Sequence, residues 1–294
     1  MDREFKIRFG PFIIVFLCKN KEVIDSLKLH YHEYISDLPP SVSIVMTVIP
    51  SVKTTLIKTG TRYNYFIDRQ KFNFGPDLIE GRWDKRRRIW HLCICKSLFT
   101  IEDIWLFNRF LCSLFYSLFF ERRTKKNEAL IIHGSGVLKD DKGYIFFGPA
   151  GSGKSTVAHL SRDFKVLHDD MNIVTFDRDN IFIEGIPFNP KQLKHTQSSA
   201  PLSMICSLHK NDVVKITRGS RKEFTKKVLP EVFLPLPLLS DDRKGAFQYL
   251  LSYIKVLGKK VPYYHLSFTK DNRFWHEIEK KEGDDGRYKK TLCS

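Results

Sequence analysis

The sequence predicts an α/β protein built around a phosphate-binding loop, with a β-rich (α+β) module before that loop. Residues 143–147 form an apolar run typical of a buried strand, and residues 148–155 fit the pattern G-x-x-x-x-G-K-[ST]. A helical pattern begins at residue 155. Strand, glycine-rich turn and helix is the order that a phosphate loop requires.

Short apolar runs separated by Gly and Pro occupy the N-terminal part of the chain. They predict strands at residues 5–9, 12–17, 43–49 and 63–67 and a helix at 21–34. The phosphate loop begins near the middle of the 294 residues, so this region is expected to be a module of its own.

The predicted boundaries divide the chain into three parts. These are a module at residues 1–125 with substrate binding as a candidate role, a phosphate-loop domain at 126–280 and a flexible basic tail at 281–294.

The phosphate loop is expected to bind a nucleoside triphosphate and its metal ion. Its glycines let backbone N–H groups turn toward phosphate oxygens at the start of a helix. Lys154 is expected to reach the β- and γ-phosphates, and the hydroxyl of Ser155 to ligate Mg²⁺. The predicted nucleotide-binding residues are Gly148, Pro149, Ala150, Gly151, Ser152, Gly153, Lys154, Ser155 and Thr156.

A second apolar strand, at residues 164–167, leads into two adjacent carboxylates, Asp169 and Asp170. The 15 positions from Lys154 to Asp169 leave room for one short helix and a turn, so we expect this strand beside the phosphate-loop strand. Both strands would then end at the sheet edge where α/β proteins bind ligands. One carboxylate would hold Mg²⁺ and the other would accept a proton from an incoming hydroxyl. A solvated Asp-Asp turn is the alternative.

A strand-like run at residues 129–137 carries His133 directly before Gly134. The polar turn at 139–142 predicts a hairpin between this run and the phosphate-loop strand. A histidine at a strand end is more often structural than catalytic, but its place before the loop makes His133 a candidate.

Taken together, His133-Gly134, the hairpin, the phosphate loop and the strand ending in Asp169-Asp170 resemble the core of the HPr kinase/phosphorylase family and its smaller relatives. The resemblance extends over roughly residues 126–280. It implies a P-loop kinase core of the type shared with ATP-dependent phosphoenolpyruvate carboxykinase. It also implies ATP- and Mg²⁺-dependent phosphorylation of serine in proteins or peptides.

The resemblance assigns a role to each matching residue. Lys154 would neutralise phosphate charge, and Ser155 would ligate Mg²⁺ with help from Asp169. Asp170 would be the general base for the acceptor hydroxyl. His133 would orient or stabilise the reacting groups.

The family's downstream Glu/Arg/Gly signature has no clear counterpart in this sequence. Glu184 is the nearest carboxylate, and Arg218 and Arg221 are the nearest basic candidates. Phosphorylase activity and HPr as the substrate are therefore not expected. The acceptor is expected to be a serine of a peptide or small protein, of which a ribosomally made peptide precursor is one kind.

Two other functions stay open. One is a small-metabolite kinase of the shikimate- or gluconate-kinase kind, which also carries aspartates soon after the phosphate loop. His133 and the long N-terminal part count against it. The other is a non-catalytic nucleotide-binding regulator or a nucleic-acid-associated protein.

The formal net charge of +16 predicts an anionic partner: a nucleotide, an acidic peptide, nucleic acid or a membrane surface. Residues 82–90 interleave basic side chains with two Trp, which suits a phosphate backbone. We favour a polar hairpin turn between Trp-bearing strands. Residues 104–120 are the membrane candidate, but Asn108 and Arg109 interrupt a stretch already short for a span. A buried helix is favoured, with surface attachment to anionic lipid as the alternative.

Six cysteines show no C-x-x-C pair and no zinc spacing. They are expected to be free thiols in a reducing compartment, which predicts a cytoplasmic location. Because HPr kinases assemble, the resemblance also permits a homo-oligomer.

Overall fold

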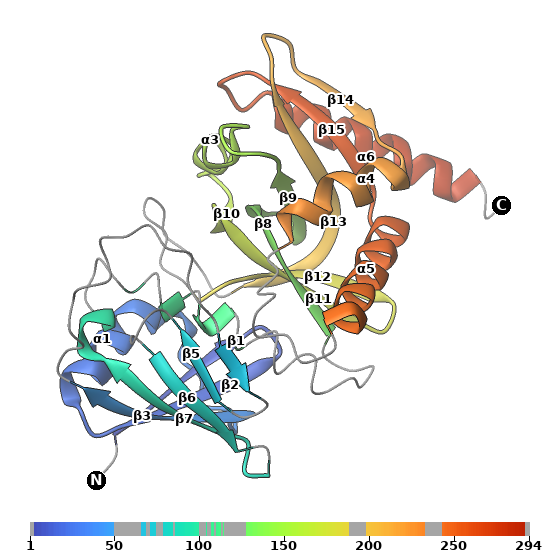
Figure 1. The fold of residues 1–294 in the computed structure, drawn as a ribbon. Helices are drawn as coiled ribbons and strands as arrows, with labels where there is room; N and C mark the ends of the chain where they lie inside the picture. Colours follow the sequence, from blue (N-terminus) through green and yellow to red (C-terminus); the bar gives the residue numbers. More distant parts are fainter. Residues whose placement is uncertain are drawn as a thin grey trace. The chain divides into compact units, whose positions relative to one another are not determined.

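The computed structural model describes residues 3–49, 66–68, 71–74, 79–84, 86–99, 128–187, 198–232 and 243–291, and single positions between 104 and 114. The chain is a mixed α/β protein, as the sequence predicted, and it separates into two compact units (Figure 1). The first unit comprises Met1–Asn127, Pro187–Asn189 and Leu234–Phe247, and the second comprises Glu128–Ile186, Pro190–Phe233 and Gln248–Ser294.

In the described part of the first unit, seven strands form one sheet in the order β1-β2-β3-β7-β6-β5-β4. Gly10, at a φ of 55°, makes the tight turn between β1 and β2, and nearly all of β2 is buried. The strands are β1 (Arg3–Phe9), β2 (Phe12–Cys18), β3 (Val42–Ile49), β4 (Phe66–Asp68), β5 (Lys71–Phe74), β6 (Ile79–Asp84) and β7 (Ile89–Cys95).

Helix α1 (Lys21–Tyr31) begins at Asn20, whose side chain accepts a hydrogen bond from the backbone N of Val23. The helix predicted to reach residue 34 ends at Tyr31 and continues as the 3₁₀ helix η1 (His32–Tyr34). A second 3₁₀ helix, η2, spans Lys96–Phe99. Of the strand predicted at 63–67, residues 63–65 lie outside the described residues.

The basic segment at residues 82–90 forms the hairpin that the sequence favoured. β6 pairs antiparallel with β7, and Asp84 accepts hydrogen bonds from the backbone N of Arg86 and of Arg87, both at 3.1 Å. Lys85 lies outside the described residues.

The predicted helix at 104–120 is described at a few positions only. Ile104, Phe107 and Phe110 are helical and buried there, in line with the buried-helix interpretation. Within the described residues, no helix combines the length and the hydrophobicity needed to cross a membrane.

Among the described residues of the second unit, eight strands form a sheet in the order β10-β8-β11-β12-β13-β15-β14, with β9 paired to β13 and β8. The strands are β8 (Glu128–Lys139), β9 (Lys142–Phe147), β10 (Lys165–His168), β11 (Met171–Asp177), β12 (Asn180–Gly185), β13 (Ser199–Lys210), β14 (Lys215–Arg218) and β15 (Tyr263–Phe268). The helices are α3 (Lys154–Leu160), α4 (Arg221–Val228), η3 (Leu229–Glu231), α5 (Arg243–Lys260) and α6 (Phe274–Thr291).

The core of the second unit lies on strands β9, β13 and β15. β13 runs parallel to both β9 and β15. Their alternate side chains, including Phe146 and Leu208, pack with Val157 of α3 and Trp275 of α6. The indole of Trp275 also donates to Ser161 Oγ at 3.0 Å, which fixes α6 to the end of α3.

The expected neighbour relation between β9 and β10 is wrong, because β8 lies between them. The 12-residue β8 offers two edges: it pairs antiparallel with β9 on one and with β10 on the other. β9 and β10 are therefore parallel to each other, and their carboxyl ends both lie beside the middle of β8, at Gly134 and Gly136.

Residues 281–291 of the predicted tail are part of α6, and residues 292–294 lie outside the described residues. Helix α6 continues to Thr291. Glu282 accepts hydrogen bonds from Lys142 Nζ at 2.7 Å and from the hydroxyl of Tyr144 at 3.1 Å. These contacts hold the helix beyond the predicted boundary against β9.

Candidate functional site

The end of β9, the end of β10 and the middle of β8 meet at one point. Gly134 of β8 pairs with Phe147, which precedes the phosphate loop, and Gly136 pairs with His168, which precedes the two aspartates. His133 pairs with Met171 at the start of β11. Elements far apart in the sequence thus deliver the predicted loop, carboxylates and histidine to the same sheet edge.

Residues 148–153 form a tight turn between β9 and α3. Gly153 has a φ of 106°, and a Cβ there would lie 2.5 Å from the ring of Phe268, so the backbone at this position requires glycine. Lys154 is buried and folds back over the loop: its Nζ donates to the carbonyls of Gly148 at 2.6 Å and Pro149 at 3.3 Å.

Ser135 joins the phosphate loop to the aspartate pair. Its fully buried hydroxyl lies 2.7 Å from the carbonyl of Lys154 and 3.1 Å from the carbonyl of Asp169. Because a hydroxyl carries one proton, the two carbonyls share it. Ser135 therefore fixes the start of α3 relative to the end of β10.

His133 lies between two carboxylates. Its Nε2 is 2.8 Å from Asp170 Oδ1, and its Nδ1 is 2.9 Å from Glu231 Oε2. Since a carboxylate only accepts hydrogen bonds, both ring nitrogens must carry protons and the ring is an imidazolium. Hydrogen bonds to Asp170 and then to Glu231 raise the pKa of His133 to about 9.

The two aspartates have opposite environments. The side chain of Asp170 is 58% exposed, and its hydrogen bond with His133 lowers the pKa of its carboxyl. The side chain of Asp169 is 12% exposed, and burial followed by the nearby charge of Asp170 raises the pKa of its carboxyl. Adjacent residues with pKa values shifted in opposite directions are typical of functional sites.

The backbone of the aspartate turn is also fixed. Nδ1 of the buried His168 accepts hydrogen bonds from the backbone N of Asp170 at 3.0 Å and of Met171 at 3.1 Å. The backbone N of Gly134 donates to the carbonyl of Asp170 at 2.7 Å. The turn is therefore tied to β8 as well as to β10.

A scan against family models matches residues 102–282, well over half of the chain, to the family described as SynChlorMet cassette protein ScmC. The chain belongs to the ScmC family. The matched range of this ScmC-family chain includes His133, the phosphate loop, both aspartates and Glu231.

The other comparisons add little to this assignment. No curated protein matches the chain. Among solved structures, the HPr(Ser) kinase/phosphatase from Coxiella burnetii is similar at 12% identity, covering 54% of this chain and 96% of its own, with a TM-score of 0.30. We therefore base the function of this ScmC-family chain on the geometry of its site.

Sequence reasoning did not identify Glu231 or Ser135 as site residues of the ScmC-family chain. Glu231 follows His133 by 98 positions, in a Leu-Pro-Glu turn without a recognisable motif. A bridge between Ile132 and Val232 holds this turn beside β8. Ser135 stood inside a strand-like run, where an isolated serine gives no signal of its role.

The candidates named for the missing downstream signature make contacts elsewhere. Glu184 accepts a hydrogen bond from Thr175 Oγ1 at 2.8 Å, and the guanidinium of Arg218 lies 6.0 Å from the ring centre of Tyr264. Arg221 is exposed at the start of α4. The structure connects none of these contacts with Asp169 or Asp170.

Within the described ranges, no group of three or more His, Cys, Asp or Glu side chains is arranged to hold a metal ion. Oxygens near the phosphate loop include the hydroxyl of the exposed Ser155 and the carboxylate of Asp169. Hydroxyl and carboxylate oxygens suit Mg²⁺, which commonly takes one or two protein ligands and completes its shell with phosphates and water.

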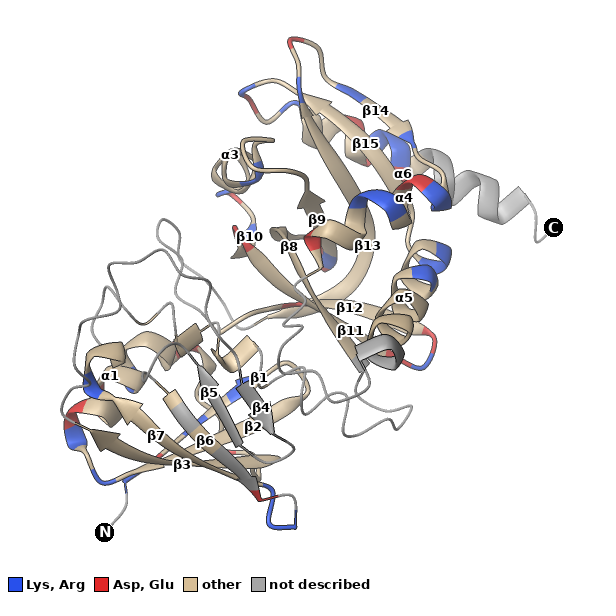
Figure 2. Cartoon of the chain, viewed as in Figure 1, with Lys and Arg blue, Asp and Glu red and all other residues tan. Residues whose placement is uncertain are grey.

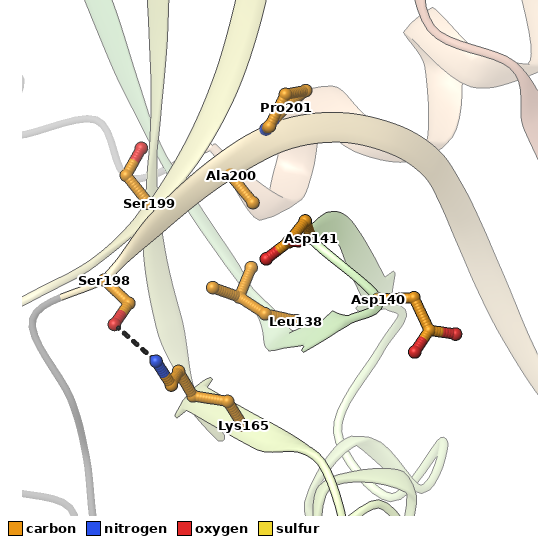
Figure 3. Close-up of a pocket in the computed structure, with 8 residues that line it drawn as sticks. All are labelled: Leu138, Asp140, Asp141, Lys165, Ser198, Ser199, Ala200 and Pro201. Carbon is orange, nitrogen blue, oxygen red and sulfur yellow. Dashed lines mark hydrogen bonds between the residues drawn. The ribbon is translucent and has the colours of Figure 1, made fainter.

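A pocket of about 450 Å³ lies at the other ends of the same strands (Figure 3). Its lining includes Asp140 and Asp141 from the β8–β9 turn and Lys165 from the start of β10. Lys165 Nζ donates to Ser198 Oγ at 3.2 Å. The pocket contains none of the predicted site residues.

Proposed function

We propose that this ScmC-family chain is an ATP- and Mg²⁺-dependent kinase that transfers the γ-phosphoryl group to the hydroxyl of a serine in a peptide or small protein. The observation that carries the proposal is the 2.8 Å contact between His133 Nε2 and Asp170 Oδ1, tied to the phosphate loop through Ser135. A carboxylate held by a cation beside a phosphate loop suits transfer to a hydroxyl.

The loop residues fit a triphosphate. Glycine at 153 leaves the backbone free to approach a ligand, and the Oγ of Ser152 is buried without a hydrogen-bond partner among the described residues. Lys154 Nζ already lies over the loop, where phosphate oxygens would replace the carbonyls of Gly148 and Pro149 as its acceptors. The loop thus offers charge and donors for the phosphate chain.

Ser155 and Asp169 would hold Mg²⁺ through one hydroxyl and one carboxylate oxygen. When bound, the ion would neutralise charge on the phosphates. Burial raises the pKa of the Asp169 carboxyl, and a bound cation would act in the opposite direction by favouring its charged form.

Asp170 would accept the proton of the serine hydroxyl. Its hydrogen bond with His133 fixes one carboxylate oxygen, and the lowered pKa keeps the group ionised at neutral pH. The imidazolium of His133 would place positive charge close to the reacting groups, where it stabilises developing negative charge. Transfer would be direct, because the described residues supply the site with a base and cations, and the mechanism assigns no covalent nucleophile among them.

A reducing, cytoplasmic setting belongs to the same proposal. The described cysteines, Cys18, Cys93, Cys95, Cys112 and Cys206, are not joined in disulfides. Reduced thiols are the usual state of cysteine in such a compartment.

The test is incubation of the purified chain with γ-labelled ATP, Mg²⁺, pools of serine-containing peptides and a pool of small metabolites. Label is expected on a peptide serine with the wild type, and it is expected to disappear with Asp170→Asn and with Lys154→Ala. Asp177→Asn, at the exposed end of β11, and Lys226→Ala, exposed on α4, are the matched controls.

Each result has one meaning. Transfer that survives both site variants would overturn the mechanism, and label on a metabolite alone would replace the peptide acceptor by a small molecule. Tight ATP binding without transfer to any acceptor would mean that the chain is a nucleotide-binding regulator.

A further inference from the structure

A second polar cluster lies on β13, β15 and α4, and the mechanism above does not use it. His265 Nδ1 is 2.9 Å from Ser207 Oγ and 3.3 Å from the hydroxyl of Tyr263. Lys227 Nζ reaches the same Nδ1 at 3.5 Å and His209 Nε2 at 3.3 Å. One ammonium and two imidazoles from three elements therefore meet at one place.

This cluster borders the phosphate loop. Ser207 pairs with Phe147, the last residue of β9, and a Cβ on Gly148 would lie 3.6 Å from the carbonyl of Leu208. His209 is the next residue after Leu208. The strand that carries the cluster thus runs directly past the start of the loop.

The α4–η3 segment connects the cluster with the candidate active site. Lys227 on α4 contacts His209 and His265, and Glu231, four positions later on η3, contacts His133. Figure 2 shows basic residues along α4 and on neighbouring β14. One short helical segment therefore contributes to both groups of side chains.

The lysine of the cluster has no direct contact with a carboxylate. Among the described residues, Lys227 forms no ion pair, although its charge interacts with that of Glu223, one turn before it. The carboxylate of Glu223 is bonded to the backbone N and Oγ of Ser220 at 2.8 and 2.7 Å. Glu223 also lies 3.7 Å from His265 Nε2. An incoming anion would find the charge of Lys227 available.

We propose that Lys227, His209 and His265 form a binding subsite for a phosphate group, separate from the phosphate loop. A phosphate presents several oxygens to donors that approach from different elements, as these three side chains do. The hydroxyls of Ser207 and Tyr263 bond to each other at 2.9 Å behind His265 and hold its ring in place. The group bound would be a phosphate of the nucleotide or of a phosphorylated product.

Phosphate binding at this subsite should depend on pH, because charged groups face the two imidazole rings. Burial and the charge of Lys227 lower the pKa of His209 and of His265. The remaining groups facing the rings are Glu223 from α4 and Tyr263 from β15. A bound phosphate would offset Lys227 and favour the protonated rings, so phosphate should bind more tightly as the pH falls and the rings take up protons.

Histidine-ring NMR with inorganic phosphate as the probe tests the subsite without any turnover. Signals are assigned with His209→Gln and His265→Gln. Phosphate is expected to raise the pKa of both rings, also in Lys154→Ala, where the phosphate loop is disabled. Lys227→Met is expected to weaken the response about tenfold in phosphate affinity, the effect of one charged hydrogen bond. Lys226→Met on the same helix is the matched control and should behave as the wild type.

Three results would overturn the proposal: rings that do not respond to phosphate, a phosphate affinity in Lys227→Met equal to that of the wild type, or a response lost in Lys154→Ala. An equal response to acetate would overturn the assignment to phosphate. Rings that respond to ADP and not to phosphoserine would assign the subsite to the nucleotide. Rings that respond to phosphoserine and not to ADP would assign it to a phosphorylated product. Because the rings are observed directly, failure of the kinase assay leaves this test intact.

Discussion

His133 and Glu231 are 98 positions apart in the chain, and their side chains meet at 2.9 Å. The contact ties the short η3 turn to β8 and places a second carboxylate on a histidine that already contacts Asp170. The side chain of Glu231 is 11% exposed, so its charge faces His133 and not solvent. Glu231 therefore acts on the site through His133, as a positioning residue.

Glu231→Gln should lower the pKa of His133 by about one unit from its value of about 9, because the ring loses one of two anionic partners. Under the proposed kinase function, the alkaline limb of the rate–pH profile should shift to lower pH by the same amount. The titration of the His133 ring by NMR and the pH dependence of kcat/KM measure the two effects. Glu277→Gln on α6 is the control, and an unchanged His133 titration in Glu231→Gln would contradict the assigned role.

The stability of the second unit should depend on pH through His133. The pKa of His133 is raised from 6.5 to about 9 by folding, so its stabilisation is complete below 6.5 and is lost as the pH rises through about 9. The ring is 40% exposed, and after discounting for solvent screening the loss should be about 1 kcal/mol. Urea unfolding of the wild type and of His133→Gln at pH 6 and pH 9.5 measures the part of the stability loss that comes from His133. Equal losses in both proteins would show that His133 is not the source.

Ser135→Ala should destabilise the second unit by about 1–3 kcal/mol, because the buried carbonyls of Lys154 and Asp169 lose a shared donor. Under the proposed kinase function, ATP binding should weaken as well, since the start of α3 is no longer fixed to the aspartate turn. Urea unfolding and isothermal titration with ATP give the two values. Ser203→Ala, on β13 outside these contacts, is the control. A variant with native stability would show that the serine does not join the two segments.

Gly153→Ala should cost about 1–3 kcal/mol of stability, because alanine at a φ of 106° is strained and its Cβ would lie 2.5 Å from the Phe268 ring. Under the proposed kinase function, this variant should also lose ATP binding. Gly151→Ala separates the two causes. Its φ is 78°, yet no atom lies within 4 Å of the added Cβ, so it should be strained but free of a clash. If both variants unfold at the same urea concentration, the contact with Phe268 carries no cost.

Much of the candidate site could be predicted because its elements are indicated by residues that lie close together in the sequence. The glycine-rich turn, the hairpin at residues 139–142 and the strand ending in Asp169-Asp170 each depend on residues a few positions apart. Backbone preferences and hydrophobic alternation act over that distance. These signals also placed His133 before the loop.

Strand order was decided by the tertiary structure. Nothing local distinguishes an arrangement in which β10 lies beside β9 from one in which β8 separates them, because the order depends on which edge of β8 each strand covers. The extent of α6 was set in the same way, since Glu282 holds the helix through Lys142 and Tyr144 of β9.

The sequence predicted the glycine-rich turn, the strands and hairpin before it, and the helix and strand that follow it. Only the tertiary structure brought Glu231 to His133, gave Ser135 its two carbonyls and placed Lys227 against His209 and His265. The physical reason is distance along the chain. Contacts between residues tens of positions apart follow from the packing of whole strands and helices, and single positions in the sequence carry no trace of that packing.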